Sequence, residues 1–263
     1  MLETIDHIGP LVSFGAAALF AGIILLRAIW LKTEGLQFAL RSVPIIIAGA
    51  LIGAGALLSF FHNRSGEPLG WLFGSEAVDF GFSEYGVVIA LLGIAVISAS
   101  IALRQSGPSR ALFVLLGLAA VIIAGEEMSW GQWIFGWSTP ETLSAVNLQN
   151  ETNLHNLVDP RLYDIIYSVI GWGTLILALT AYGFIQRPAH DSDFVLLRLL
   201  RSAGEWLRES RYGLITTISA AVLLQHELFE EYSEFVFGFA ALLFFLHLIR
   251  PDSEPAHRGV SHA

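Results

Sequence analysis

The sequence predicts an all-α protein built as an integral membrane bundle of seven transmembrane helices. Three observations predict this fold: the low content of charge, the recurrence of long uncharged stretches and the uneven placement of the basic residues. Of the 263 residues, 54% are hydrophobic and 14% are charged, whereas a soluble domain carries about 25% charged residues. A soluble enzyme of this length would lack the charge to cover its surface, so the composition excludes that class.

The charge balance and the cysteine count exclude further classes of function. Asp and Glu total 23 against 14 Lys and Arg, which gives a net charge of −9. An acidic chain repels polyanions, so nucleic acid is not an expected partner. The chain has no cysteine, which rules out disulfide bonds, thiolate metal sites and cysteine nucleophiles. The lipid bilayer is the first expected partner.

The predicted spans cover residues 9–31, 43–62, 85–104, 111–135, 160–186, 212–230 and 233–250 of one transmembrane domain, 1–250. A helix needs about 20 residues to cross the hydrocarbon core of a bilayer. The first three spans contain the uncharged runs Gly9–Leu26, Pro44–Phe61 and Gly86–Leu103. The last two spans are short, and a Glu-rich segment separates them. Residues 251–263 are expected to form a polar cytoplasmic tail.

The basic residues decide the orientation, because Lys and Arg concentrate in cytoplasmic loops. With the N-terminus outside, twelve of the 14 basic residues lie on the inner side. These are Arg27, Lys32, Arg41, Arg104, Arg110, Arg187, Arg198, Arg201, Arg208, Arg211, Arg250 and Arg258. Only Arg64 and Arg161 lie on the outer side. The bias predicts seven crossings with the N-terminus out and the C-terminus in, since an even number of spans would break it.

An amphipathic helix is predicted between the fifth and sixth spans, over residues 192–210. Arg198 and Arg208 fall on one polar stripe of this helix, whereas Leu200 and Leu207 fall on the opposite face. Arginines on such a helix interact with anionic lipid headgroups. We therefore expect the helix to lie flat on the cytoplasmic surface of the membrane.

Polar residues gather at the predicted outer ends of the spans, in residues 126–133, 147–156 and 226–234. At 1.5 Å per residue, Glu126 and Glu127 lie about 22–24 Å up the fourth span. His226 and Glu227 lie at about the same level, roughly 21–22 Å up the sixth. An ionisable side chain inside the membrane costs about 2.5–3.5 kcal/mol. These groups are therefore expected to face one another, a metal ion or a water-filled cavity.

Carboxylates and imidazoles in this arrangement indicate acid–base or metal chemistry. The candidate catalytic residues are Glu126, Glu127 and Glu227. The candidate ligands of a metal are Glu127, His155, His226 and Glu230, and residues of these types suit a divalent cation. The residues expected to complete the site are Trp130, Gln132, Asn150, Glu151 and Asn153.

Structural explanations compete with each functional one. The carboxylates from Glu230 to Glu234 also fit a solvated turn at the membrane surface. A buried Glu126 or Glu127 could serve only to bind a Trp or an Asn. His155 lies among four asparagines and fits a hydrogen-bonding role in the loop as well as it fits a ligand role. The His-Glu-x-x-His and Glu-x-x-His patterns of known metal sites do not occur at these positions.

The pattern Glu-Glu-x-Ser-Trp-Gly-Gln, beginning at Glu126, is followed by Asn-Leu-His-Asn, ending at Asn156. Together they resemble a pattern in an uncharacterised family of bacterial polytopic inner-membrane proteins. The family pattern has Arg at the position of Trp133 and Gly near Asn150. The resemblance is confined to this segment. It implies a multi-pass protein of the bacterial inner (plasma) membrane and assigns no reaction.

Three functions fit these features. The first is a membrane-embedded, metal-dependent enzyme that acts on a lipid or a lipid-linked substrate, with a metal-bound water as nucleophile and a Glu as general base. The second is a non-catalytic subunit or assembly factor of a larger integral-membrane complex, whose other subunits would be its partners. The third is a cation- or proton-coupled transporter. In each, the carboxylate and histidine site faces the periplasm.

Overall fold

The computed structural model describes residues 12–22, 25, 36–74, 80–157, 159–184 and 195–249. In these ranges all regular structure is helical and no strand occurs, which confirms the all-α prediction. The predicted tail 251–263 lies outside the described residues. So do residues 9–11 of the first predicted span and the basic residues Arg27, Lys32, Arg187, Arg250 and Arg258.

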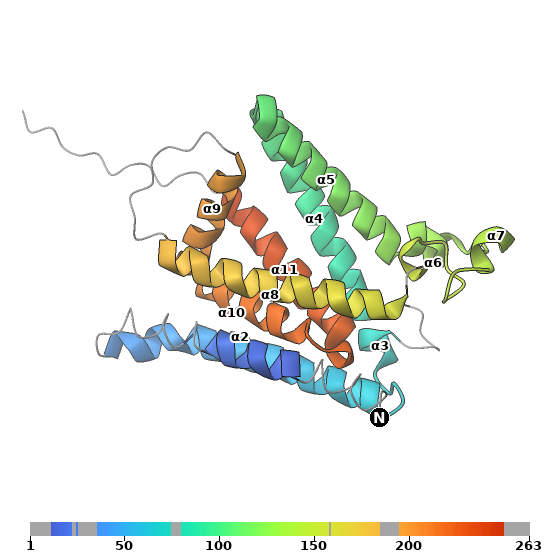
Figure 1. The fold of residues 1–263 in the computed structure, drawn as a ribbon, viewed down its shortest axis with the longest axis horizontal. Coiled ribbons are helices and arrows are strands. Elements are labelled where there is room, and N and C mark those ends of the chain that lie inside the picture. Colours follow the sequence, from blue (N-terminus) through green and yellow to red (C-terminus); the bar gives the residue numbers. More distant parts are fainter. Residues whose placement is uncertain are drawn as a thin grey trace, which may run out of the picture.

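The longer helices make up most of the molecule (Figure 1). They are α2 (Leu36–Arg64), α4 (Phe82–Arg104), α5 (Gly107–Glu127), α8 (Pro160–Phe184), α9 (Val195–Glu209), α10 (Arg211–Leu223) and α11 (Glu230–Leu248). The shorter ones are α3 (Gly70–Phe73), α6 (Gln132–Phe135) and α7 (Glu141–Ser144), with one-turn 3₁₀ helices η1 (Ser129–Gly131), η2 (His155–Leu157) and η3 (Glu227–Phe229). An apolar helix over Val12–Gly22 precedes α2.

Five stretches of the described chain are long and apolar enough to cross a membrane. They are Ile46–Arg64, Phe82–Arg104, Gly107–Glu127, Arg161–Thr180 and Glu227–Leu248, each of 19 to 23 residues. The apolar helix Tyr212–Leu223 coincides with the sixth predicted span but is shorter than a span. Of the first predicted span, the structure describes the apolar helix Val12–Gly22 and residue 25. The structure therefore supports a membrane-embedded protein. Seven crossings and their orientation stay predictions.

The packing of the helices brings the ends of several of them together. α4 and α5 pack against each other, α11 packs on α4, and α10 contacts α11, α2 and α8. A cluster of buried residues that includes Ala17, Leu175, Ile218 and Ala221 lies inside the bundle. The alanines of this cluster allow helices to approach closely. As a result, the ends of α2 and α5 and the starts of α4, α8 and α11 lie on the same side of the molecule (Figure 1).

α5 ends at Glu127, eight residues before the predicted end of the fourth span at 135. The chain leaves the helix because Ser129 (φ 45°) and Trp130 (φ 55°) adopt the left-handed backbone conformation, as does Gly131 (φ 90°). Residues with a side chain rarely adopt this conformation, and it cannot continue a right-handed helix. Glu127 is therefore the last residue of the helix, and the polar run that follows forms a folded loop.

α10 ends at Leu223, so the sixth span is shorter than predicted. Thirteen residues make a helix of about 20 Å, against a hydrocarbon core of about 30 Å. His226 follows in an extended conformation, and its Nδ1 accepts a hydrogen bond from the backbone of Leu228 at 3.3 Å. His226 and Glu227 thus lie in the turn before α11, and not on a continuous sixth helix as predicted.

The predicted segment 192–210 contains α9. Trp206 and Leu207 of α9 are buried against the bundle, whereas Leu196 and Leu200 are exposed. Arg198 donates a hydrogen bond to Ser109 Oγ in α5 at 3.0 Å. One side of α9 therefore packs on the protein. Its place on a cytoplasmic membrane surface stays a prediction.

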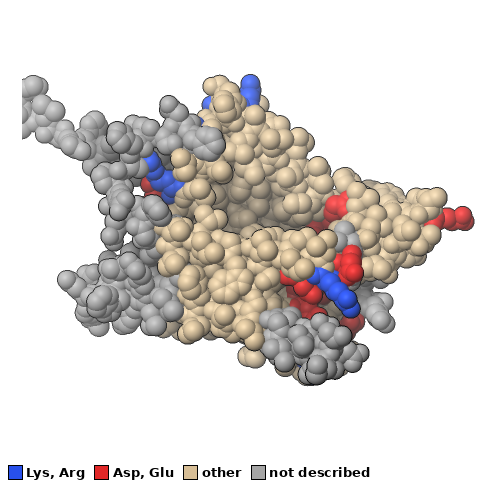
Figure 2. All heavy atoms as spheres, in the orientation of Figure 1, with Lys and Arg blue, Asp and Glu red and all other residues tan. Residues whose placement is uncertain are grey.

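Charge is sorted along the molecule. Figure 2 shows Asp and Glu gathered at the end from which α6 and α7 project, whereas most of the visible Lys and Arg lie at the other ends of the helices. Arg104 ends α4 and Arg110 lies in the first turn of α5, at that opposite side. The separation of acidic from basic residues that the sequence indicates is thus present in the fold.

A buried amide joins three helices. Gln225 is 4% exposed, and its Oε1 accepts hydrogen bonds from Ser13 Oγ at 2.7 Å and Ser168 Oγ at 2.9 Å. Its Nε2 donates to the carbonyl of Ala221 at 3.0 Å. Gly171 leaves room for this amide, because a Cβ there would lie 2.1 Å from Gln225 Nε2.

Replacing Gly171 by alanine should destabilise the protein. The added methyl group would displace Gln225, and overpacking of this kind costs about 1–3 kcal/mol. Thermal unfolding in detergent measures the effect. Gly173→Ala is the matched control on the same helix, because no heavy atom lies within 4 Å of the added Cβ. Equal unfolding midpoints for the two variants would contradict the close packing at Gly171.

Candidate functional site

A cavity of about 860 Å³ lies at the acidic end of the bundle. α2 and α5 end at it, α4, α8 and α11 begin at it, and the loop 148–156 contributes to its wall. Eight glutamates line it: Glu67, Glu84, Glu126, Glu127, Glu151, Glu230, Glu231 and Glu234. The other polar side chains of the wall are His62, Asn63, Gln149, His155, Asn156, Tyr163 and Tyr167.

The described wall of this cavity contains no Lys or Arg. Ionised carboxylates that share a site repel one another. This repulsion is strongest where water is scarce, because the effective dielectric constant is low there. The cavity is therefore electrostatically suited to a positively charged occupant.

Glu126 is held by three N–H donors. Its Oε1 accepts from the indole Nε1 of Trp130 at 2.8 Å, and its Oε2 accepts from the backbone of Leu154 at 2.6 Å and of His155 at 3.1 Å. Glu126 lies in the last turn of α5, where the helix dipole disfavours a negative charge. Charge-assisted hydrogen bonds of this kind offset that cost. The loop thus fixes the carboxylate at the cavity wall.

A buried network supports the loop from behind. Oε2 of Glu151 accepts hydrogen bonds from Ser129 Oγ at 2.9 Å, from Asn153 Nδ2 at 2.6 Å and from Asn156 Nδ2 at 3.0 Å. Asn153 is 1% exposed, and its Oδ1 accepts from Asn147 Nδ2 at 3.1 Å. None of the buried side-chain atoms of this network lacks a hydrogen-bond partner, as is usual for buried polar groups. The network makes the loop a rigid part of the cavity.

Gln132 joins the two halves of the same loop. Its Oε1 accepts from the backbone of Thr152 at 2.6 Å and lies 3.3 Å from Thr139 Oγ1. Thr139 also donates to the carbonyl of Asn150 at 2.6 Å. Asn150 itself has a left-handed backbone (φ 59°), a conformation that Asn tolerates better than most residues.

Backbone strain is concentrated around the cavity. Within the described ranges, the residues other than glycine with positive φ are Glu67, Ser129, Trp130 and Asn150. Glu67 lines the cavity, and the other three lie in the loop that carries Glu151. Such conformations cost of order 1–3 kcal/mol each and cluster at functional sites. Their distribution points to the cavity as the functional region of the molecule.

His155 contributes an uncharged imidazole. Burial lowers the pKa of His155 below its ordinary value of 6.5, although the carboxylates of Glu126 and Glu151 raise it. Its Nδ1 lies 3.8 Å from Glu126 Oε2, which is too far for a hydrogen bond. The nitrogen is buried and has no hydrogen-bond partner. His155 can therefore accept a proton or a ligand in the cavity.

The wall opposite the loop consists of residues from α8 and α11. The hydroxyl of Tyr167 donates to Oε1 of Glu234, and that of Tyr163 donates to the carbonyl of His155. Oε2 of Glu231 is buried and has no hydrogen-bond partner. An unsatisfied buried acceptor is costly, so this oxygen and the nitrogen of His155 mark places where a ligand would be stabilised.

The structure brings together five of the predicted site residues. Glu126, Glu127, Glu151, His155 and Glu230 all line the cavity. Four other predicted residues lie outside the cavity wall and make hydrogen bonds that hold the loop. These are Trp130, Gln132, Asn150 and Asn153, whose contacts are described above.

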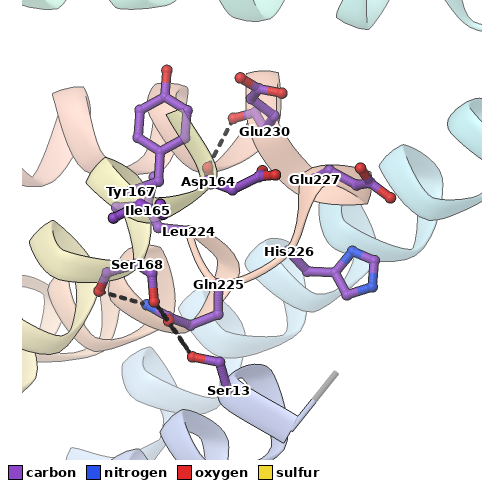
Figure 3. Close-up of a pocket in the computed structure, with 11 residues that line it drawn as sticks. Ser13, Asp164, Ile165, Tyr167, Ser168, Leu224, Gln225, His226, Glu227 and Glu230 are labelled. Atoms are coloured by element: carbon purple, nitrogen blue, oxygen red, sulfur yellow. Dashed lines mark hydrogen bonds between the residues drawn. The ribbon is translucent and has the colours of Figure 1, made fainter. Parts of the chain in front are cut away.

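The predicted residues His226 and Glu227 lie elsewhere. They line a smaller pocket of about 190 Å³ together with Asp164 and Gln225. Figure 3 shows the row of Ser13, Gln225 and Ser168 on one side of this pocket and the carboxylates of Asp164, Glu227 and Glu230 on the other. Tyr167 and Glu230 line both pockets. The end of α10 at Leu223 is the reason that His226 and Glu227 are directed away from Glu126.

The predicted metal ligands are not assembled around one point. In the part of the chain that the structure describes, no three His, Asp or Glu side chains are placed to hold a metal ion. His226 lines the smaller pocket, and Glu127 and His155 line the larger one. The carboxylates are spread over the wall of a large cavity, and this favours a ligand larger than a bare ion.

Sequence reasoning missed several residues of the cavity. Glu84 lies in the first turn of α4, and Tyr163 and Tyr167 lie near the start of α8. The signal for Glu84 was available, because it is an acidic residue beside a long uncharged run. The tyrosines resembled ordinary aromatic residues of the membrane interface. Only the packing of α8 against α10 and the hydrogen bond from Tyr167 to Glu234 of α11 assign them to the site.

The pKa of His155 should fall further in Glu126→Gln. The glutamine oxygen can still accept from the backbone of Leu154 and His155, while the NH2 group loses the hydrogen bond from Trp130. The substitution removes the charge that raises the pKa of His155. Titration of the imidazole by NMR measures the shift. Glu141→Gln, on exposed α7, should leave the pKa unchanged. A rise in Glu126→Gln would contradict the assigned cause.

Acid should loosen the same loop. The pKa of His155 lies below 6.5 in the folded protein, so the unfolded chain takes up this proton at a higher pH than the folded chain does. The contribution of His155 to stability is therefore present above about pH 6.5 and is lost as the pH falls below that value.

Asn153→Ala should destabilise the loop by about 1–3 kcal/mol, because it leaves buried partners without their hydrogen bonds. Hydrogen exchange of the backbone amides of Leu154 and His155 measures the effect. Thr142→Ala, an exposed change on α7, is the control. Unchanged protection in Asn153→Ala would show that the network does not hold the loop.

Comparisons with known proteins do not indicate a function for this chain. No model of a protein family matches the chain, and no curated protein or solved structure matches it. The resemblance of residues 126–156 to a bacterial membrane family therefore stays a prediction. The function of the chain has to be argued from the cavity and its charges.

Proposed function

We propose that the chain is a multi-pass protein of a bacterial inner membrane whose acidic cavity, open toward the periplasm, binds a cationic ligand. The observation that carries this proposal is the composition of the cavity wall. Eight glutamates line one space, and the wall as described contains no Lys or Arg to neutralise them. Binding of a cation lowers the repulsion among these carboxylates, so charge complementarity gives both affinity and selectivity.

The size and lining of the cavity favour an organic cation over a bare ion. A volume of about 860 Å³ lies within the usual range of small-molecule sites, about 300–1,000 Å³. Phe73, Phe80, Tyr163 and Tyr167 add aromatic rings to the wall. Aromatic faces attract ammonium groups. Carboxylates and aromatic rings together suit an alkylammonium group, with the charge and the carbon chain bound by different parts of the wall.

The arrangement supports proton transfer as well as binding. His155 is uncharged and has a free Nδ1, and it lies beside the carboxylate of Glu126. Tyr167 is hydrogen-bonded to Glu234 on the opposite wall. A bound amine would lie between a potential proton acceptor and a tyrosine hydroxyl. Acid–base chemistry on the ligand is thus compatible with the site.

Titration of spermidine tests the proposal. The protein, in nanodiscs of phosphatidylcholine, should bind spermidine, and binding should weaken as salt is added. Glu127→Gln/Glu230→Gln removes two carboxyl groups that could pair with a bound cation and keeps the shape of the wall, so affinity should fall by at least about tenfold, or about 1.4 kcal/mol. Isothermal titration calorimetry measures the affinity for spermidine of the unchanged protein and of the double variant.

Glu141→Gln is the control for this titration, because Glu141 is exposed on α7 and does not line the cavity. It should bind spermidine like the unchanged protein. Absence of binding to the unchanged protein, or equal affinity in the double variant, would refute a cation-binding cavity.

A divalent metal is the second candidate, and the two buried atoms without partners favour it. His155 Nδ1 and Glu231 Oε2 belong to residues that line the cavity, and imidazole nitrogens and carboxylate oxygens bind divalent metals. A metal-dependent enzyme acting on a lipid would use this site. Elemental analysis of protein purified without chelators should then show one metal per chain, lost in His155→Ala/Glu231→Gln. Absence of stoichiometric metal would remove this candidate.

A further inference from the structure

The loop that forms one wall of the acidic cavity presents an unusual apolar surface. We refer to residues 128–157 as the connecting segment. Large hydrophobic side chains are exposed along it, among them Ile134, Phe135, Trp137, Val146, Leu148 and Leu154. The rings of Phe135 and Trp137 stack at a centroid distance of 5.3 Å. A soluble loop would present polar residues to water.

The position of the connecting segment explains this surface. It starts where the candidate span Gly107–Glu127 ends and returns to where the span Arg161–Thr180 begins. Both of its ends are therefore at the level of the lipid headgroups. It contains no Lys or Arg, and its acidic residues are Glu141 and Glu151. Tryptophan and other aromatic residues are enriched at that level of a membrane, so the apolar face of the segment fits the headgroup region.

The apolar surface and the cavity share a wall. Leu148 is 64% exposed and also lines the cavity. Glu126, two residues before the connecting segment, and His155, near the end of the segment, line the cavity as well. The cavity therefore opens beside a surface that fits the headgroup region. A ligand that resides in the lipid leaflet can reach the carboxylates without crossing bulk water.

Charges at this end of the molecule match a zwitterionic headgroup. Eight glutamates and no Lys or Arg line the described cavity wall, and Oε2 of one of them, Glu231, is buried without a hydrogen-bond partner. Arg64, at the end of α2, and Arg161, at the start of α8, are exposed and do not line the cavity. A primary ammonium group fits inside, where its three N–H donors can bind carboxylates. The phosphate of the same headgroup would stay outside, on the side of the two arginines.

We propose that the cation bound in the cavity is the primary ammonium group of a membrane lipid, which enters from the leaflet in contact with the connecting segment. This inference rests on the proposed cation-binding function and names its ligand class. A quaternary ammonium group has no N–H donor, so the site should prefer an ethanolamine to a choline headgroup.

Lipid retention tests the inference. The protein is reconstituted in nanodiscs that contain equal amounts of phosphatidylethanolamine, phosphatidylcholine and phosphatidylglycerol with identical acyl chains. Native mass spectrometry then counts the lipids that stay bound. Phosphatidylethanolamine should be retained at least about fivefold over the other two, a preference of about 1 kcal/mol. Glu127→Gln/Glu230→Gln should abolish the preference.

A second pair of variants isolates the route from the membrane. Phe135→Ser/Trp137→Ser removes the apolar contact with the headgroup region but leaves the cavity wall unchanged, so it should reduce the retention of phosphatidylethanolamine and preserve spermidine binding. Leu115→Ser/Leu118→Ser, at exposed positions of α5, is the matched control and should retain the lipid.

The outcomes separate the two proposals. Equal retention of the three lipids, with spermidine still bound, would overturn the lipid inference and leave the cation-binding cavity standing. Loss of spermidine binding in Phe135→Ser/Trp137→Ser would also overturn it, because the segment would then act on the cavity and not on access from the membrane. No binding of either spermidine or phosphatidylethanolamine by the unchanged protein would overturn both.

Discussion

The structure depends on one electrostatic constraint: carboxylates from separate helices share a single cavity at the end of an apolar bundle. Glu84, Glu230 and Glu231 lie in the first turns of α4 and α11, where the helix dipole stabilises a negative charge. Glu126 and Glu127 lie in the last turn of α5, where the dipole opposes it. The protein therefore needs additional donors at the end of α5, and the loop supplies them to Glu126. This need explains why the most elaborate loop of the described chain follows that helix.

Local backbone conformation and charge stabilisation are coupled at this point. The left-handed conformations of Ser129 and Trp130 turn the chain back after α5, so that the indole of Trp130 packs over Gly125 and donates to Glu126. A Cβ on Gly125 would lie 2.9 Å from the indole ring. Glycine is therefore needed at this position for the chain to turn back after α5. Ser129, fully buried, then bonds to Glu151. Strain in two residues is thus offset by hydrogen bonds that hold two cavity carboxylates.

Much of the fold was predictable from composition, because charge-poor runs of about 20 residues have few alternatives to a membrane helix. Glu126, Glu127 and His155 could be assigned to one site because a polar run followed an apolar span. His226 and Glu227 could not be placed correctly, since their position depends on the end of α10, and nothing in the apolar run before them marks that end. Tyr167 and Glu234 meet only through the packing of α8 near α11. Their pairing depends on the relative positions of helices, which one sequence does not encode locally.

The smaller pocket bears on whether a cation could pass beyond the cavity. Tyr167 and Glu230 line both spaces, so the acidic cavity and the smaller pocket adjoin at these two side chains. Beyond them, the amide of Gln225 is hydrogen-bonded to Ser13, Ser168 and Ala221. A transported ion would have to break this buried row, and each bond lost without replacement costs about 1–3 kcal/mol. These polar groups line the smaller pocket, where they are hydrogen-bonded to one another. On the proposed function, an acidic cavity that adjoins this hydrogen-bonded row and the apolar connecting segment is better suited to holding a headgroup than to passing an ion.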